Sequence, residues 1–200
     1  MKNIEEKIEA FKKIVIKNNH DNPAFKYREW FVGDHLEIVE KIAKELCNLH
    51  PEADRDLVMV LAWFHDFGNI IDLDNKYEIT KTKGTEAMRL VGFEEKFIES
   101  VLIAWEKMEK KNEIDISKES IEVQIISSAD GASHFVGLFH SNYFRDDLGE
   151  SLESIRGRLK AKMKKDWERK IVLPEVKKAF RWRYLRALEI VGEYPERFIL

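Results

Sequence analysis

The chain has 200 residues, of which 44% are hydrophobic, and its formal net charge is -3. This length and apolar content are enough for one sizeable core, so we expect one domain over residues 1–200. Only 9 Gly and 4 Pro are present, which is too few turn-forming residues for the many tight turns of a strand-rich fold. Because no apolar run could span a bilayer and the charged N-terminus does not resemble a signal peptide, we expect a cytoplasmic protein without a membrane partner.

Apolar residues recur at helical spacing along most of the chain, which predicts an all-helical, compact multi-helix bundle. Asp34 is the expected N-cap of the second helix, and Asp54 or Asp56 that of the third. The third helix carries the run LVMVLAWF, which is hydrophobic on all sides and therefore central. The polar, aperiodic residues 69–83 predict a loop or lid. The expected helices cover about residues 4–19, 34–50, 54–66, 84–91, 94–111, 118–139, 150–170 and 174–192.

Charge is unevenly distributed along the chain. Residues 151–200 contain 14 Lys and Arg against 7 Asp and Glu, a net charge of +7, which leaves -10 for residues 1–150. The basic segment either faces an anionic ligand or pairs internally with the acidic part. The single cysteine, Cys47, excludes an intrachain disulfide and fits a core position better than a metal site.

A pair of ionisable residues ends the central helix. In LAWFHDFGN, His65 and Asp66 come directly after the apolar run. Burying a carboxylate there is unfavourable unless a cation or hydrogen bonds compensate its charge, and a divalent metal would do so. His35, in the first turn of the second helix, and Asp130, on the apolar face of the helix at 118–139, are suitable further ligands.

This pattern resembles the HD-domain metal-dependent phosphohydrolases. In that family a His on one helix, a His-Asp pair ending the next core helix and a distant Asp hold the metal. The segments GDHLEIVEKIA, VLAWFHDFGN and IISSADGASHF are similar to the family's motif surroundings, and the resemblance covers a motif-bearing core of about residues 30–140, with C-terminal helices at about 150–192 outside it. It implies that His35, His65, Asp66 and Asp130 are the metal ligands. A second His-Asp pair, His20-Asp21, lies outside the pattern.

The resemblance also implies the reaction. It is hydrolysis of a phosphate ester by water that the metal activates, with Asp66 in the catalytic centre. Asp74 is a second catalytic candidate, because some nucleotidase members carry an acid at a similar distance after the His-Asp pair. Those members have Glu where this chain has Asn69, and the alternative for Asp74 is a solvated loop acid.

One divalent transition metal ion is expected as the cofactor. Branches of the family that hold more metals add histidines on later helices, whereas this chain has Trp105 and Glu106 in the corresponding helix. Imidazole and carboxylate ligands suit Mn, Fe, Co, Ni or Zn. His134 lies one helical turn after Asp130, so it is either an outer-shell group or a core or helix-surface histidine.

Recognition of phosphate requires cations near the metal. Lys81 and Lys83 in the expected lid, together with Arg28 before the second helix, are the candidates for substrate binding. The expected partner is a small phosphate ester or a nucleotide.

Two other functions stay open from the sequence alone. The chain is a non-catalytic HD-type nucleotide-binding module if the site binds without turnover. An RNA-associated helical protein would use the basic C-terminal segment, although the acidic overall charge speaks against nucleic acid as a partner. The sequence also leaves a homodimer open as an alternative to a monomer.

Overall fold

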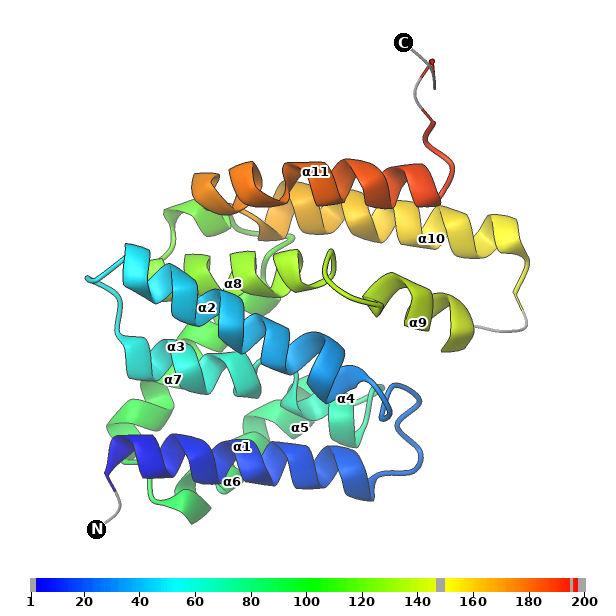
Figure 1. The fold of residues 1–200 in the computed structure, drawn as a ribbon. Helices are drawn as coiled ribbons and strands as arrows, with labels where there is room; N and C mark the ends of the chain where they lie inside the picture. Colours follow the sequence, from blue (N-terminus) through cyan, green and yellow to red (C-terminus); the bar gives the residue numbers. More distant parts are fainter. Residues whose placement is uncertain (1–2, 147–149, 195, 198–200) are drawn as a thin grey trace.

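The computed structural model describes residues 3–146, 150–194 and 196–197. All regular elements of these residues are helical, as predicted, and they stack in layers with α1 on one side and α10 and α11 on the other (Figure 1). No helix among the described residues is both long and apolar enough to cross a membrane. The α-helices are α1 (Ile4–Asp21), α2 (Glu37–Leu49), α3 (Arg55–Phe64), α4 (Phe67–Ile71), α5 (Lys76–Ile79), α6 (Thr85–Val91), α7 (Glu95–Glu109), α8 (Ile121–Ser133), α9 (Phe139–Asp146), α10 (Leu152–Lys165) and α11 (Pro174–Ile190).

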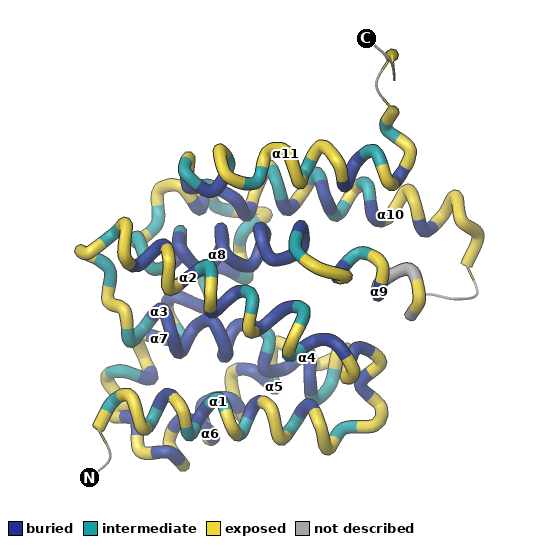
Figure 2. The backbone as a smooth tube through the Cα atoms, viewed as in Figure 1, coloured by how far each residue is buried: buried dark blue, intermediate teal, exposed yellow. Residues whose placement is uncertain are grey.

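Helices α2, α3 and α8 pack against one another at the centre of the molecule, and α3 and α8 are buried over most of their length (Figure 2). Every residue of α3 from Val58 to Phe64 is buried. Each large apolar side chain buried in this way contributes roughly 1.5–3 kcal/mol. The central position predicted for this helix is confirmed, as is Asp54 as its N-cap, because its carboxylate accepts hydrogen bonds from two backbone amides of the first turn. One hydrophobic cluster extends from Ile8 to Val191 and includes the buried, unpaired Cys47.

The predicted N-cap at Asp34 is wrong. A turn of π-helix, η1 (Val32–Leu36), runs without a break into α2, so Asp34 lies inside the helix. Its carboxylate accepts a hydrogen bond from the Asn142 side chain on α9, at 3.1 Å, instead of capping a backbone amide. The π-turn places His35 on the inner side of the helix, where its side chain is 1% exposed.

The loop predicted at residues 69–83 is wrong for most of its length, because α4, α5 and a π-turn, η2 (Thr80–Gly84), occupy all of this stretch except residues 72–75. The backbone NH of Gly68 donates to the Thr80 hydroxyl at 2.9 Å, and that hydroxyl donates to the Lys76 carbonyl at 2.8 Å. A Cβ at Gly68 would lie 2.0 Å from this carbonyl oxygen, so only glycine allows the approach. The short polar helices are held by this tertiary contact, which helical periodicity does not reveal.

The helix predicted over residues 118–139 is shorter than expected. A 3-10 turn, η3 (Ile116–Lys118), precedes α8, and α8 itself ends at Ser133. A turn follows in which Gly137 has a φ of 59°, a left-handed conformation that glycine adopts readily, and α9 then begins at Phe139. Near the C-terminus, α10 continues into a π-turn, η4 (Asp166–Lys170), which packs on α8. This contact brings the basic C-terminal segment to the polar end of the central helix.

Candidate metal centre

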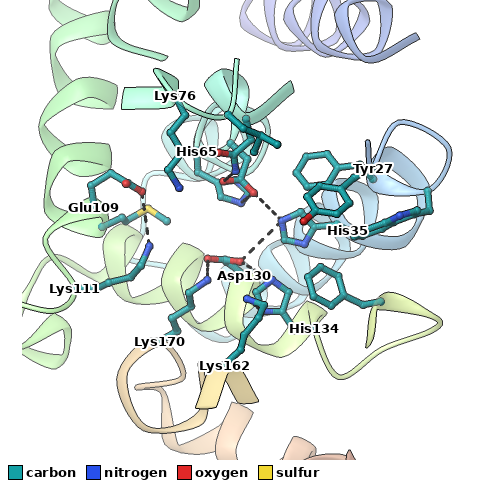
Figure 3. A pocket seen from close by; sticks show the side chains of 17 residues that line it. Tyr27, His35, His65, Lys76, Glu109, Lys111, Asp130, His134, Lys162 and Lys170 are labelled. Carbon is teal, nitrogen blue, oxygen red and sulfur yellow. Dashed lines mark hydrogen bonds and ion pairs between the residues drawn. The ribbon is translucent and has the colours of Figure 1, made fainter. Parts of the chain in front are cut away.

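A cavity of about 220 Å³ lies where η1, the end of α3, α8 and η4 meet (Figure 3). Its walls have different chemical character. Imidazoles and carboxylates line the centre, and aromatic rings and lysines line the parts around it. The lining residues are Tyr27, Trp30, Phe31, His35, His65, Asp66, Asn69, Leu73, Lys76, Met108, Glu109, Lys111, Asp130, His134, Phe139, Lys162 and Lys170.

His35 presents an unprotonated Nε2 to this cavity. The Ser133 hydroxyl donates its proton to the Asp130 carbonyl oxygen at 2.7 Å, so its Oγ can only accept from His35 Nδ1, at 2.9 Å. Burial lowers the pKa of His35, which keeps the ring neutral with its one proton on Nδ1. The Nε2 lone pair then points towards Asp66 Oδ2, at 3.1 Å.

His65 is arranged in the same way. It is the C-cap of α3, and its Nδ1 donates to the Ala62 carbonyl oxygen at 3.0 Å. Its Nε2 is buried and has no hydrogen-bond partner among the described residues. The Trp105 indole donates to the His65 backbone carbonyl at 3.2 Å and so fixes the chain at this point. His65 lines the cavity, so this nitrogen is free to bind a ligand there.

Asp66 directly follows His65 and leaves the helical conformation, with φ -115° and ψ 18°. One oxygen, Oδ1, accepts a hydrogen bond from Asn69 Nδ2 at 2.6 Å, while Oδ2 lies 3.4 Å from His65 Nε2 and also faces His35. Burial by itself would raise the pKa of Asp66, but the imidazoles of His65 and His35, when they are protonated, lower it below its usual range. Asp66 is therefore a carboxylate with one oxygen turned to the cavity.

The two carboxylate oxygens of Asp130 likewise have different surroundings. Lys170, which is 7% exposed, donates to Oδ2 at 2.6 Å, and Oδ1 faces the histidines, 3.9 Å from His35 Nε2. Burial opposes ionisation, but the charge of Lys170 and the neighbouring histidines outweigh it and hold the pKa of Asp130 well below its usual value. Asp130 is thus ionised in the last turn of a buried helix.

These four residues fit a divalent metal ion. Imidazole lone pairs and carboxylate oxygens face one another at 3.1–3.9 Å, an arrangement that is repulsive unless a cation lies between them. Ligand atoms of His35, His65 and Asp66 all lie within 4.8 Å of one another. A mixed set of nitrogen and oxygen donors suits a transition metal of intermediate softness. The described residues therefore include groups that could hold such an ion.

Lysines line the cavity from two sides. Lys162 and Lys170 come from α10 and η4, whereas Lys76 and Lys111 come from the opposite side, and all four reach the lining (Figure 3). The buried Asp166 pairs with Lys162 at 3.2 Å and with Lys170 at 3.5 Å. The basic C-terminal segment thus does both things that the sequence left open, because it pairs internally and also faces the cavity.

The structure brings His35, His65, Asp66 and Asp130 together, but not the other predicted site residues. Asp74 is exposed outside the cavity, while its neighbours Leu73 and Lys76 line it. Lys81 pairs with Glu106 at 2.8 Å. Lys83 and Arg28 line separate depressions, and His20-Asp21 ends α1 with both side chains exposed.

Sequence reasoning missed several residues that shape the site. Asn69 orients Asp66, Ser133 orients His35, and Lys170 orients Asp130. A signal was present in the sequence for two of them, since SSADGAS interrupts an apolar helix with polar residues and Asn69 stands one turn after Asp66. No sequence signal joined Lys170 to Asp130, because forty residues separate them.

The match to known proteins agrees with this geometry. A family model described as HD domain matches residues 32–133, which include His35, His65, Asp66 and Asp130. Comparisons with curated proteins and with solved structures gave no significant match. Because the matched segment covers half of the sequence and contains the whole His and Asp set, the chain belongs to the HD-domain family of metal-dependent phosphohydrolases.

Proposed function

We propose that this protein hydrolyses a small phosphate ester, with one divalent transition metal ion held by His35, His65, Asp66 and Asp130. The observation that carries the proposal is that two imidazoles and two carboxylates line one cavity together with lysines, and that ligand atoms of His35, His65 and Asp66 lie within 4.8 Å of one another. When bound, the ion would supply Lewis-acid chemistry, drawing electron density from a phosphoryl oxygen and making water more acidic.

The protein's own residues would fix the direction of approach. Asn69 donates a hydrogen bond to one oxygen of Asp66, and Lys170 donates one to one oxygen of Asp130. Each carboxylate therefore turns only its other oxygen towards the cavity. Ser133 and the Ala62 carbonyl hold the two imidazoles in one tautomer. A site whose groups are already oriented loses little freedom when it binds, which favours rapid reaction.

Phosphate recognition would fall to the lysines of the rim. Lys76, Lys111 and Lys162 reach the cavity from two sides, and their charges match a phosphate dianion. Arg28, Lys81 and Lys83 remain proposals for binding a more distant part of the substrate, since they lie outside the cavity lining. Asp74 also remains a proposed catalytic acid, since its neighbours Leu73 and Lys76 line the cavity although Asp74 itself does not.

The substrate would be small. The cavity of about 220 Å³ lies below the range of roughly 300–1,000 Å³ that is common for drug-sized ligands. Tyr27, on the far side of the cavity from Lys76 and Lys111, is an aromatic surface on which a sugar or base could pack (Figure 3), and Trp30 also lines the cavity. A phosphomonoester, with a nucleoside monophosphate as the upper size, fits these dimensions and charges.

The test is a substrate panel with metal-reconstituted protein. Metal-free protein is loaded in turn with Mn, Fe, Co, Ni or Zn and assayed on p-nitrophenyl phosphate, nucleoside monophosphates, nucleoside triphosphates and cyclic nucleotides. We expect turnover of monoesters that depends on the metal and disappears with a chelator. Nucleotide binding without turnover under every metal would instead establish a non-catalytic binding module. Salt-dependent binding of RNA without turnover would support the RNA-associated alternative.

A further inference from the structure

His134 stands at the metal centre but outside the predicted ligand set and one residue beyond the family match. It is the C-cap of α8 and only 4% exposed. Its ring lies nearly parallel to that of His35, with centroids 5.2 Å apart and an interplanar angle of 21°. The two imidazoles therefore face the same space (Figure 3).

The proton of His134 is assigned by its contacts. Nδ1 lies 2.6 Å from Asp166 Oδ2, and this carboxylate is only 1% exposed and ion-paired with Lys162 and Lys170. Lys162 Nζ also lies 3.4 Å from Nδ1, but the contact with Asp166 is much shorter. An ionised carboxylate only accepts hydrogen bonds, so Nδ1 carries the proton and donates it to Asp166. Nε2 points the other way, to Asp130 Oδ1 at 3.3 Å.

All three histidines of the cavity share one arrangement. In each, Nδ1 meets an oxygen acceptor, which is Ser133 Oγ for His35, the Ala62 carbonyl for His65 and Asp166 for His134, and Nε2 faces inward. A histidine that binds a metal commonly donates its second ring nitrogen to a carboxylate or carbonyl in this way. Ligand atoms of His134, His35 and Asp130 lie within 4.8 Å of one another, and this group shares His35 with the group of His35, His65 and Asp66.

We propose that His134 is a fifth protein ligand of the same ion and that Asp166 is the positioning residue that aims it. This inference rests on the metal site of the proposed function. It extends the centre beyond the matched segment, because Asp166 belongs to η4 and its lysine partners to α10 and η4. The C-terminal helices would then be part of the metal centre.

The experiment measures metal binding and does not depend on turnover. Metal-free wild type, His134→Gln and Asp166→Asn are titrated with Mn²⁺ and with Zn²⁺ against a competing chelator that reports free metal, and bound metal per chain is counted. Glutamine keeps a side chain of similar length and an amide for Asp166, so folding is less at risk than with alanine. His140→Gln is the matched control, since His140 is also largely buried and near this region but does not line the cavity.

We expect one ion per wild-type chain, a loss of affinity of about 100-fold or more in His134→Gln and of roughly 10–100-fold in Asp166→Asn, the range for removing an outer-shell partner. His140→Gln should bind as wild type does. Wild-type affinity in His134→Gln would overturn the inference. So would two ions in the wild type, of which only one disappears in the variant, because His134 would then hold a separate ion. A wild type that binds no metal would instead overturn the proposed function.

Discussion

Replacing Lys170 by methionine tests the buried charge network from which the metal centre is built. Lys170 compensates Asp130 through a contact of 2.6 Å and Asp166 through one of 3.5 Å. Methionine fills a similar volume but leaves both carboxylates without this cation. Breaking a buried ion pair by removing one partner destabilises a protein by roughly 3–5 kcal/mol. For a chain of this length, that corresponds to a fall in Tm of about 6–20 °C.

The pH of the measurement follows from the sign of the pKa shift. Burial opposes the charge of Lys170, but Asp130 and Asp166 outweigh it and raise its pKa above the usual value. Stability from a raised pKa is fully present below the unfolded value and is lost only as the pH rises through the folded value. At pH 7.5 the contribution of the pair is therefore complete.

The assay compares thermal and denaturant unfolding of metal-free and metal-saturated protein. The loss in Lys170→Met should be smaller with metal, because the ion then compensates Asp130 in place of the lysine. The exposed Lys165, at the end of α10, gives the matched control Lys165→Met, for which we expect a change within about 0.5 kcal/mol. A metal-free Lys170→Met variant that melts within about 2 °C of the wild type would refute the charge assignment.

The other predictions concern ligands, packing and pH. Asp66→Ala should abolish metal binding, phosphatase activity and the rise of Tm with added Mn or Zn, whereas His20→Ala should leave all three unchanged. Metal analysis that finds a full metal content in Asp66→Ala, or no metal in His20→Ala, would contradict the ligand assignment. Gly131→Ala should lower the free energy of unfolding in urea by roughly 1–3 kcal/mol and weaken metal affinity, because the new Cβ would lie 2.8 Å from the Lys170 Cβ. The control Gly157→Ala has open space around its Cβ and should raise stability by about 0.5–1 kcal/mol. Equal effects of the two substitutions would argue against the close packing of η4 on α8. Burial and the charge of Lys162 lower the pKa of His140 to about 4, so the unfolded state takes up protons first, and this residue alone should lower stability by about 2 kcal/mol between pH 7 and 5. The buried His35 and His134, whose pKa values are also lowered, add to the fall. His140→Phe should therefore reduce the slope by its own share, and an unchanged slope would exclude His140 as a source.

Local signals in the sequence were sufficient for most of the fold. The apolar run of α3 and the cap at Asp54 predicted a central helix, and the structure confirms both. The helix expected at about 174–192 is also present, and it begins at Pro174, in the first turn, where proline is favoured. These features depend on neighbours within one or two helical turns, which the sequence displays directly.

The sequence failed where a distant segment decides the local structure. Residues 69–83 read as a loop because they are polar, yet the hydrogen bonds between Gly68, Lys76 and Thr80 hold them as short helices. Asp34 resembled a cap, but the π-turn before α2 and the contact with Asn142 place it inside a helix. Tertiary contacts in each case override the local preference.

The candidate site also contains residues that the sequence predicts and residues that only the tertiary structure reveals. The sequence by itself predicted His35, His65, Asp66 and Asp130 as one set of metal ligands. A buried carboxylate at the end of an apolar helix needs a cation or hydrogen bonds to compensate its charge, and the spacing of the four residues matched a family pattern. Only the tertiary structure decided which cations and carboxylates accompany this set. Lys170 and Asp166 reach the site through the packing of η4 on α8, and a contact between residues so far apart leaves no periodic trace in the chain. Electrostatic compensation acts through space, so its partners are fixed by packing and not by sequence distance.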